Sequence, residues 1–334
     1  MTAPYPLVFE PALMSKVWGG DRLAAFGKRI APGATIGESW EVADLGSTSA
    51  SGAGGGGVRS VIANGPLRGK TLHDAMELWG SQLLGDAKPS SDGGFPLLVK
   101  FLDARENLSV QVHPSPAYAA ANPGANLKTE CWFILDATPG AVIYKGVKPG
   151  VTREQFERAI TSGEVMQVME SYAAVQGECH NLPSGTVHAL GAGVLVAEVQ
   201  TPSDTTFRVY DFGRTGRELH VKQAMECIDF STAPRAIDMT RNPPLGGVLD
   251  TGFFRVWRVA CANEDDVPVG HSLGCFTVMT LRGHGSLFSE EGEFAPIELA
   301  PGRTVLVPAS VAQETCLRPG ENDKLECLVA ALSG

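Results

Sequence analysis

The sequence predicts a mainly β fold with helical insertions in its N-terminal half. The 334 residues include 39 Gly and 22 Pro, and short runs rich in β-branched and aromatic residues recur between these turn signals. Such a succession of short apolar runs and turns is typical of a β-sandwich or β-barrel. Hydrophobic residues make up 43% of the chain and charged residues 19%, a balance that allows one large domain or two, with a sizeable core.

The first ninety residues combine short strands with helical segments. Strands are expected at 8–9 and 39–43, with a short helix between them at 21–26. Residues 47–60 are rich in Gly and Ser, which predicts an enlarged hairpin loop or a flexible excursion. The apolar residues of 71–84 recur at helical spacing, and the threonine that begins this segment is a suitable cap, so we expect a helix there.

The middle of the chain is predicted as strands that are interrupted by a helical insertion. Four strands are expected, at 95–104, 108–113, 131–135 and 141–144. Thr152 is a suitable N-cap with Glu154 and Gln155 in the first turn, which predicts a helix over 152–162. We expect three further segments: helical at 165–175, strands over 177–210 and a helix at 219–228.

Two histidines, a glutamate and a glutamine fall in three short segments: Gln111-Val-His113-Pro, Lys128-Thr-Glu130 and Pro183-Ser-Gly185-Thr-Val-His188. Imidazole, carboxylate and amide groups are the ligand types of a catalytic zinc site. The alternation over 108–113 predicts a strand on which Ser109, Gln111 and His113 point the same way. A lone His in a strand is usually packed in a core and a lone Glu is usually solvated, but the joint pattern favours a metal site.

The donor set favours an open catalytic site over a closed structural one. A structural zinc site is normally closed by four protein ligands, often cysteines, whereas this set has no Cys and a neutral Gln is a weak ligand. Such a site leaves room for a water or a substrate oxygen, and its metal would polarise a carbonyl or hold a diol. Zinc fits these ligands, but manganese or iron also accepts nitrogen and oxygen donors, so the metal stays open.

Charged side chains near the candidate ligands predict an anionic substrate. Lys100 ends an apolar run, Lys128 lies in the segment of the candidate Glu ligand, and Glu198 and Arg208 follow a predicted strand. Lys and Arg together could hold a phosphate and stabilise a developing negative oxygen. Taken singly, the lysines would be interpreted as solvated or snorkelling side chains, and the arginine as a partner of nearby aspartates.

A turn motif is repeated in the two halves of the chain. Residues Gly177 to His188, of the form Gly-x5-Pro-x-Gly-x2-His, resemble the second conserved motif of the cupin barrel, whose His faces the barrel interior. Residues Gly302 to Gln313 follow the same template with Ser for Gly and Gln for His. We therefore expect two cupin-type, jelly-roll barrels, the second without a metal site. The alternative is a chance recurrence in a chain so rich in Gly and Pro.

The two expected barrels set the expected domain organisation. The Pro- and Gly-rich stretch 231–247 is the predicted linker. Residues 1–230 would form the catalytic metal-binding domain, with helical inserts at about 66–90 and 150–176. Residues 245–334 would form the second barrel.

Several motifs, in order along the chain, make it similar to the type I phosphomannose isomerases in their shorter bacterial form. These motifs are Trp18-Gly-Gly, Gly37-Glu-Ser-Trp-Glu41, Phe95-Pro-Leu-Leu-Val-Lys100, Leu108-Ser-Val-Gln-Val-His-Pro114, Lys128-Thr-Glu-Cys-Trp132, Gly185-Thr-Val-His-Ala189 and Glu198-Val-Gln-Thr-Pro-Ser-Asp204 with Arg208. They extend over roughly two thirds of the chain. The C-terminal third is similar only in its general cupin character.

This resemblance implies a set of site residues. It implies one zinc ion per chain, bound by Gln111, His113, Glu130 and His188. It implies that Arg208 is the catalytic arginine and that Glu198 and Lys128 lie close to the reacting atoms. It also implies that the substrate pocket includes Trp18, Lys100 and Ser109.

The implied reaction interconverts mannose 6-phosphate and fructose 6-phosphate. A proton moves between C1 and C2 through a cis-enediol, while a metal and a cationic side chain stabilise the enediolate. The base stays open among Glu198, Lys128, His188 and a metal-bound water, and a hydride shift is equally compatible with the sequence. The family also includes members that act on other aldoses, so the sugar is less secure than the reaction class.

Two rival functions are disfavoured. A metal-dependent cupin oxygenase would use two or three His and a Glu around a redox metal, but here Gln111 stands in the place of the first His. A non-catalytic sugar-phosphate-binding bicupin needs no base, and the retained Lys100, Lys128, Glu198 and Arg208 argue against it. The second barrel could serve as a dimer interface or a lid, so both a monomer and a homodimer stay open.

The composition limits the classes of partner and the cellular compartment that we expect for this protein. A net charge of −10 argues against nucleic acid and an anionic membrane surface, so an anionic substrate must meet a local cluster of Lys and Arg. Seven scattered Cys without a CxxC pair predict reduced thiols in a cytoplasmic protein. The chain has no apolar run of about 18 residues and no basic start followed by an apolar run, so neither a membrane span nor a secretory signal is expected.

Overall fold

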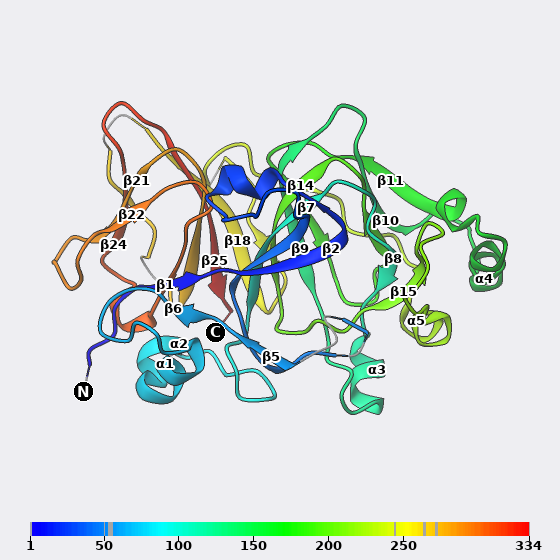
Figure 1. Cartoon of the computed structure of the whole chain (residues 1–334), viewed down its shortest axis with the longest axis horizontal. Coiled ribbons are helices and arrows are strands. Elements are labelled where there is room, and N and C mark those ends of the chain that lie inside the picture. The colour runs from blue at the N-terminus through cyan, green and yellow to red at the C-terminus, as the bar shows by residue number, and fades with distance from the viewer. Residues whose placement is uncertain are drawn as a thin grey trace.

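The computed structural model of this chain describes residues 2–49, 51–52, 56–243, 245–262, 265–270 and 273–333 (Figure 1). Within these residues the strands pair into antiparallel sheets, and helices are few and short. The predicted mainly β fold is therefore confirmed.

The first pair of sheets forms the sandwich that holds the candidate site, on the right in Figure 1. Its seven-stranded sheet has the order β16 (Ile237–Asp238), β12 (Glu178–Leu182), β9 (Glu130–Ala137), β14 (Val194–Gln200), β7 (Leu98–Ala104), β2 (Ala12–Gly20) and β3 (Ile36–Val42). Its five-stranded sheet has the order β11 (Met169–Ala173), β10 (Val142–Val147), β13 (His188–Leu190), β8 (Val110–Val112) and β15 (Phe207–Tyr210). Apolar side chains of both sheets, including Trp132 and Ile143, pack in one cluster between them.

The second pair of sheets comes largely from the C-terminal part of the chain, in orange and red in Figure 1. Its seven-stranded sheet has the order β17 (Leu249–Asp250), β18 (Phe254–Cys261), β25 (Leu325–Leu332), β20 (Phe276–Arg282), β23 (Thr304–Val307), β1 (Leu7–Glu10) and β6 (Val61–Ile62). The facing sheet has the order β19 (Val267–Pro268), β24 (Thr315–Pro319), β21 (Gly285–Ser289) and β22 (Ile297–Leu299). Val278 and Leu317 belong to the apolar cluster between these two sheets.

The two seven-stranded sheets pack against each other and form the main core. Phe101 and Phe133 from one sheet share a cluster with Met279 and Leu328 from the other. Strands of the first sheet are therefore covered on both faces, and β7 and β14 are buried along their whole length. Burial of this much apolar surface is the dominant stabilising contribution, and it fixes the strands that carry the site.

The N-terminal strands cross between the two predicted domains. β1 pairs with β23, so that Leu7 lies opposite Leu306, and β6 extends the same sheet. The predicted boundary at 231–247 stays a prediction. Residues from the start of the chain nevertheless complete a sheet made mostly from its end, which ties the two halves together.

The predicted helices are mostly found, with small shifts. The segment 71–84 forms α1 (Leu72–Trp79) and α2 (Ser81–Leu84), and Thr71 caps α1 through a capping box with Asp74. Thr152 caps α4 (Arg153–Ser162) through a second box with Gln155. Further helical elements are η1 (Arg22–Phe26), α3 (Pro116–Ala121), α5 (Val221–Cys227) and η3 (Ala309–Val311).

The prediction of a helix over 165–175 is wrong. Only η2 (Val165–Val168) is helical, and the chain then continues as β11. Side chains of β11 alternate between more and less buried, and Tyr172 pairs with Ile143 of β10. The period of two residues in this segment, combined with an available sheet edge, prevails over its helical propensity.

The Gly- and Ser-rich segment 47–60 is an enlarged hairpin. β4 (Asp44–Ser47) pairs with β5 (Gly56–Arg59), and residues 50 and 53–55 lie outside the described part of the chain. Among the described residues, no helix has the length and apolar character needed to cross a membrane.

Candidate metal centre and active-site pocket

A pocket opens in the N-terminal sandwich, and its lining combines residues from both sheets. Its lining contains seven of the side chains singled out from the sequence: Trp18, Lys100, Ser109, Gln111, Lys128, Glu198 and Arg208. These residues come from β2, β7, β8, β14, β15 and the segments that lead into β8 and β9. The tertiary structure therefore brings together groups that are up to 190 positions apart in the chain.

The pocket lining carries an excess of positive charge. Five cationic side chains line it, and three carboxylates face them: Lys16, Lys100, Lys128, Arg208 and Arg217 against Glu38, Glu198 and Asp204. The lining thus has two more cationic than anionic groups, although the whole chain has a net charge of −10. Such a local excess attracts an anionic ligand to this cleft.

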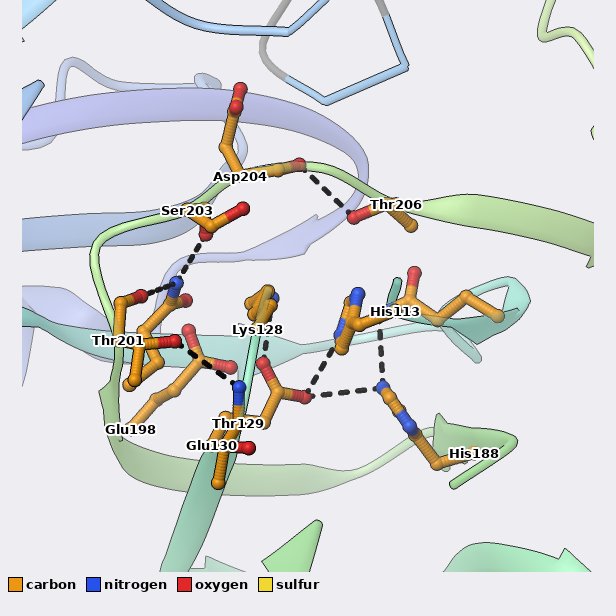
Figure 2. Close-up of polar contacts among 12 residues, drawn as sticks. His113, Lys128, Thr129, Glu130, His188, Glu198, Thr201, Ser203, Asp204 and Thr206 are labelled. Atoms are coloured by element: carbon orange, nitrogen blue, oxygen red, sulfur yellow. Dashed lines mark hydrogen bonds and ion pairs between the residues drawn. The ribbon is translucent and has the colours of Figure 1, made fainter. Parts of the chain in front are cut away.

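His113, Glu130 and His188 form a compact buried cluster behind this pocket. Their potential ligand atoms all lie within 4.8 Å of one another, and this is the one group of three or more such residues within the described part of the chain. Glu130 Oε1 lies 3.4 Å from His113 Nε2 and 3.1 Å from His188 Nε2. Figure 2 shows the carboxylate of Glu130 directed at the two imidazoles.

Backbone carbonyls fix the orientation of both imidazoles. His113 Nδ1 lies 2.9 Å from the Thr205 carbonyl oxygen, and His188 Nδ1 lies 2.8 Å from the Thr186 carbonyl oxygen. Each Nδ1 must therefore carry the proton, which leaves both Nε2 atoms with lone pairs that face Glu130. This is the arrangement by which metal-bound histidines are usually oriented.

Gln111 completes the cluster on β8. The register places it opposite His188 of β13 on one side and opposite Arg208 of β15 on the other. Its Nε2 lies 3.4 Å from His188 Nε2, and its Oε1 accepts a hydrogen bond from Ser109 Oγ at 3.3 Å. Rotation of the amide by 180°, which leaves its shape unchanged, turns its oxygen toward the cluster, where the oxygen could serve as a fourth metal-ligand atom.

The charges around Glu130 favour a deprotonated ligand set. Burial by itself raises the pKa of this carboxyl, but Lys128 and His113 outweigh burial and hold the pKa well below its usual range. Burial and the neighbouring Lys128 lower the pKa of His113 to about 3. A carboxylate and a neutral imidazole are the forms that bind a metal, so these residues are ready to bind a divalent cation.

Lys128 and Lys100 are both buried, which contradicts their interpretation as solvated side chains. Lys128 Nζ lies 2.6 Å from Glu130 Oε2, on the side of the carboxylate away from the imidazoles. Lys100 Nζ lies 2.8 Å from Glu198 Oε2 and donates to Gln200 Oε1 at 2.6 Å. Burial acts to lower the pKa of Lys100, but Glu198 and Glu38 outweigh it and raise the pKa above its ordinary value.

Arg208 is directed toward the pocket by neutral partners. Its Nε donates to Ser109 Oγ at 3.2 Å and its NH1 donates to the Glu218 carbonyl oxygen at 2.8 Å. The alternative expectation of an ion pair with nearby aspartates is not met for Asp211, which pairs instead with Arg214 and Arg217. Burial and the nearby Arg217 lower the pKa of Arg208, so the two guanidinium groups together form a strongly positive region.

Sequence reasoning missed several residues of the pocket. Glu38 and Trp40 lie on one face of β3 and reach the pocket, and Arg217 lies in the loop after β15. Trp132 donates through Nε1 to Glu198 Oε1 at 2.8 Å. The strand was expected only at 39–43, so Glu38 lay just outside it, and the sequence does not indicate which strand lies beside it.

Comparison with known proteins decides the family. Residues 7–136 match the family model described as phosphomannose isomerase type I, catalytic domain. The chain is 40% identical over 239 residues to mannose-6-phosphate isomerase ManA of Bacillus subtilis, covering 69% of this chain and 70% of that protein. The chain belongs to the type I phosphomannose isomerase family. The expectation of an enzyme of this family is thereby confirmed.

Two further relatives agree with this assignment. The chain is 41% identical over 273 residues to the probable mannose-6-phosphate isomerase GmuF of B. subtilis, covering 76% of this chain and 79% of that protein. The crystal structure of the mannose 6-phosphate isomerase from B. subtilis matches with a TM-score of 0.81 at 29% identity, over 98% of this chain and 99% of that one. The likeness in structure therefore extends over both sandwiches.

Proposed function

We propose that this chain is a zinc-dependent aldose-ketose isomerase that interconverts mannose 6-phosphate and fructose 6-phosphate. One observation carries the proposal: a buried cluster of metal-binding atoms lies behind a pocket whose lining has a positive excess. The identity of the proposed sugar is taken from relatives in the same family, which are named as mannose-6-phosphate isomerases.

The donor set supports zinc as the cofactor. His113, His188, Glu130 and Gln111 would hold it, and within the described residues neither His113 Nε2 nor Glu130 Oε1 receives a hydrogen bond. Buried polar atoms are seldom left in this state unless an ion or water satisfies them. Zinc bound there supplies a Lewis acid that polarises a carbonyl and stabilises negative charge on oxygen.

The two arginines support a phosphorylated substrate. Arg208 and Arg217 both line the pocket, and burial and the charge of Arg217 lower the pKa of Arg208, so a phosphate dianion bound beside them would be stabilised. Guanidinium groups bind phosphate through paired hydrogen bonds, which a neutral hydroxymethyl group could not replace. We therefore assign the phosphate to the Arg208 side of the pocket and the reacting carbons to the Lys128 side.

The reaction requires a base that moves a proton between C1 and C2. Glu198 is the proposed base, because Lys100 and Trp132 hold its two oxygens in a fixed position in the pocket. Lys128 is already bonded to a carboxylate and is assigned the role of a cation that stabilises the enediolate oxygens. Ser109 and Trp18 line the pocket and would contact the sugar.

The test is a coupled assay for fructose 6-phosphate formed from mannose 6-phosphate. It compares metal-replete protein, chelated protein and chelated protein to which zinc is returned. We expect activity to disappear on chelation and to return with zinc. No activity in the replete protein would overturn the proposed substrate, and activity that survives complete removal of metal would overturn the proposed cofactor.

A further inference from the structure

Glu38 is a mostly buried carboxylate in the pocket to which the proposed mechanism gives no role. It lies on β3, and its side chain is 12% exposed. Its Oε1 lies 3.2 Å from Lys16 Nζ, while its Oε2 accepts a hydrogen bond from Trp40 Nε1 at 2.6 Å. The same Oε2 lies 3.9 Å from Lys100 Nζ, too far for a hydrogen bond but close enough for a strong ionic interaction.

Lys100 therefore lies between two carboxylates from different strands. On β7 it faces Glu198 of β14 on one side and Trp40 of β3 on the other, and its Nζ lies 5.0 Å from the centre of the Trp40 ring. Glu198 already forms a close ion pair with the ammonium group, and Gln200 accepts a hydrogen bond from it. Simple neutralisation of Lys100 thus requires no second carboxylate, and the presence of Glu38 needs another reason.

The catalytic cycle supplies that reason. When Glu198 takes up the substrate proton, it becomes neutral, and Lys100 loses the charge of its closest partner. A buried ammonium without a counter-ion is strongly destabilised. Glu130, a further carboxylate whose charge acts on Lys100, is already paired with Lys128 at 2.6 Å.

We propose that Glu38 is the permanent counter-ion of Lys100, a positioning residue that keeps this ammonium in place while Glu198 carries the proton. The role rests on the proposed function of Glu198 as the base. Burial alone would raise the pKa of Glu38, but Lys16 and Lys100 lower it to about 2, so this carboxylate keeps its charge throughout the working pH range. Lys16 and Trp40 hold it in place from the other sides.

The first arm of the test measures stability and needs no substrate. Glu198→Gln stands in for the protonated base, and Glu38→Gln removes the second charge while its amide oxygen can still accept from Trp40. Each single variant leaves Lys100 beside one carboxylate. We expect the melting temperature of the double variant to fall by about 4 °C more than the sum of the two single shifts, because only there is the ammonium unpaired.

A second double-mutant cycle, with an exposed carboxylate in place of Glu38, controls for the general effect of removing charge on the melting temperature. Glu77→Gln changes a carboxylate whose side chain is 72% exposed on α1, outside the pocket lining. In combination with Glu198→Gln it should give additive shifts, since distant sites usually do. If the melting-temperature shifts of Glu38→Gln and Glu198→Gln were also additive in their double variant, the proposal would be overturned.

The second arm measures turnover of mannose 6-phosphate. Glu38→Gln should lower kcat about tenfold and change KM less than about twofold, because substrate binding does not require the proton to move. An unchanged kcat, or a loss confined to KM, would overturn the positioning role. If the unmodified protein shows no turnover, the proposed function fails, but the melting cycle still decides the pairing of Lys100 with Glu38.

Discussion

Lys100 and Glu198 lie opposite each other on neighbouring strands, with the Lys100 Nζ 2.8 Å from the Glu198 Oε2. Both side chains are almost completely buried, yet they open onto a pocket that also contains Arg208. A buried ion pair is a weak source of stability, since desolvation offsets most of the attraction. Its retention at the pocket is better explained by function, and it supports the assignment of Glu198 to proton transfer.

Replacement of Arg208 by Ala should remove most turnover without loss of metal. Arg208 bonds to Ser109 and to a backbone carbonyl, so its side chain reaches the ligand cluster only indirectly, through Ser109 and Gln111. We expect kcat/KM to fall by about 100-fold or more, with zinc content unchanged by elemental analysis. Arg208→Lys keeps the charge but loses the paired geometry, so it should recover only a small part of the activity. Equal turnover in the Ala variant would show that the arginine has been assigned wrongly.

Replacement of His188 by Ala should abolish metal binding. The variant removes one of two oriented imidazole nitrogens and leaves Glu130 with a single histidine neighbour. We expect the purified protein to contain less than about a tenth of the zinc of the unmodified chain, because affinity depends steeply on ligand number. A full complement of zinc would refute this ligand assignment. His220, which lies outside the cluster, is a matched control whose replacement should keep the metal.

Turnover in deuterated water distinguishes proton transfer from a hydride shift. If Glu198 carries the proton as proposed, it exchanges with solvent during the enediol stage, and deuterium enters the product at C1 or C2. We expect mass spectrometry to detect this incorporation when the reaction is stopped early. Product free of carbon-bound deuterium would favour the hydride shift and remove the need for a base.

We expect the buried charge of Lys145 to lower the free energy of unfolding near neutral pH. It is fully buried, its Nζ has no hydrogen-bond acceptor within the described residues, and burial lowers its pKa to about 8. Between pH 8 and about 10.5 the unfolded chain keeps this proton while the folded chain has released it, so the contribution of Lys145 to stability rises with pH. Below pH 8 both states are protonated and the folded chain contains a buried charge.

Lys145→Met tests this contribution, because it keeps the length of the side chain without the charge. We expect the variant to be more stable than the unmodified chain at pH 7, on the order of 2 kcal/mol, and this advantage to shrink by pH 10. Urea unfolding at both pH values measures the difference. An advantage that stays constant with pH would mean that Lys145 does not titrate as described.

The local features of this chain could be predicted from the sequence. Thr71 and Thr152 cap their helices as expected, because capping depends on residues within one turn. The alternation over 108–113 placed Gln111 on a strand and predicted the side of the strand that it shares with Ser109. The ligand cluster was also predictable as a set of residue types, although its assignment to a metal stays a proposal.

The predictions failed where long-range pairing decides the outcome. The segment that contains Tyr172 became a strand because β10 offered a free edge, a fact that no local pattern contains. Glu38 was part of a recognised motif, but its position beside Lys100, 62 residues further along the chain, follows from the pairing of β3 with β7. Likewise, Trp132 reaches Glu198 only because β9 and β14 are neighbours.

Local patterns in the sequence were enough to predict the β character of the chain, the capped helices and the residue types of the site. These properties depend on backbone preferences and on side-chain alternation over a few residues. Three relationships became visible only in the folded chain: the first strand completes a sheet of the C-terminal half, Lys100 lies between two carboxylates, and backbone carbonyls orient the imidazoles. These relationships depend on strand register and on burial, and both arise from the packing of distant segments. Burial also strengthens the electrostatic interactions between charged groups in the pocket, because the local dielectric constant is lower than in water.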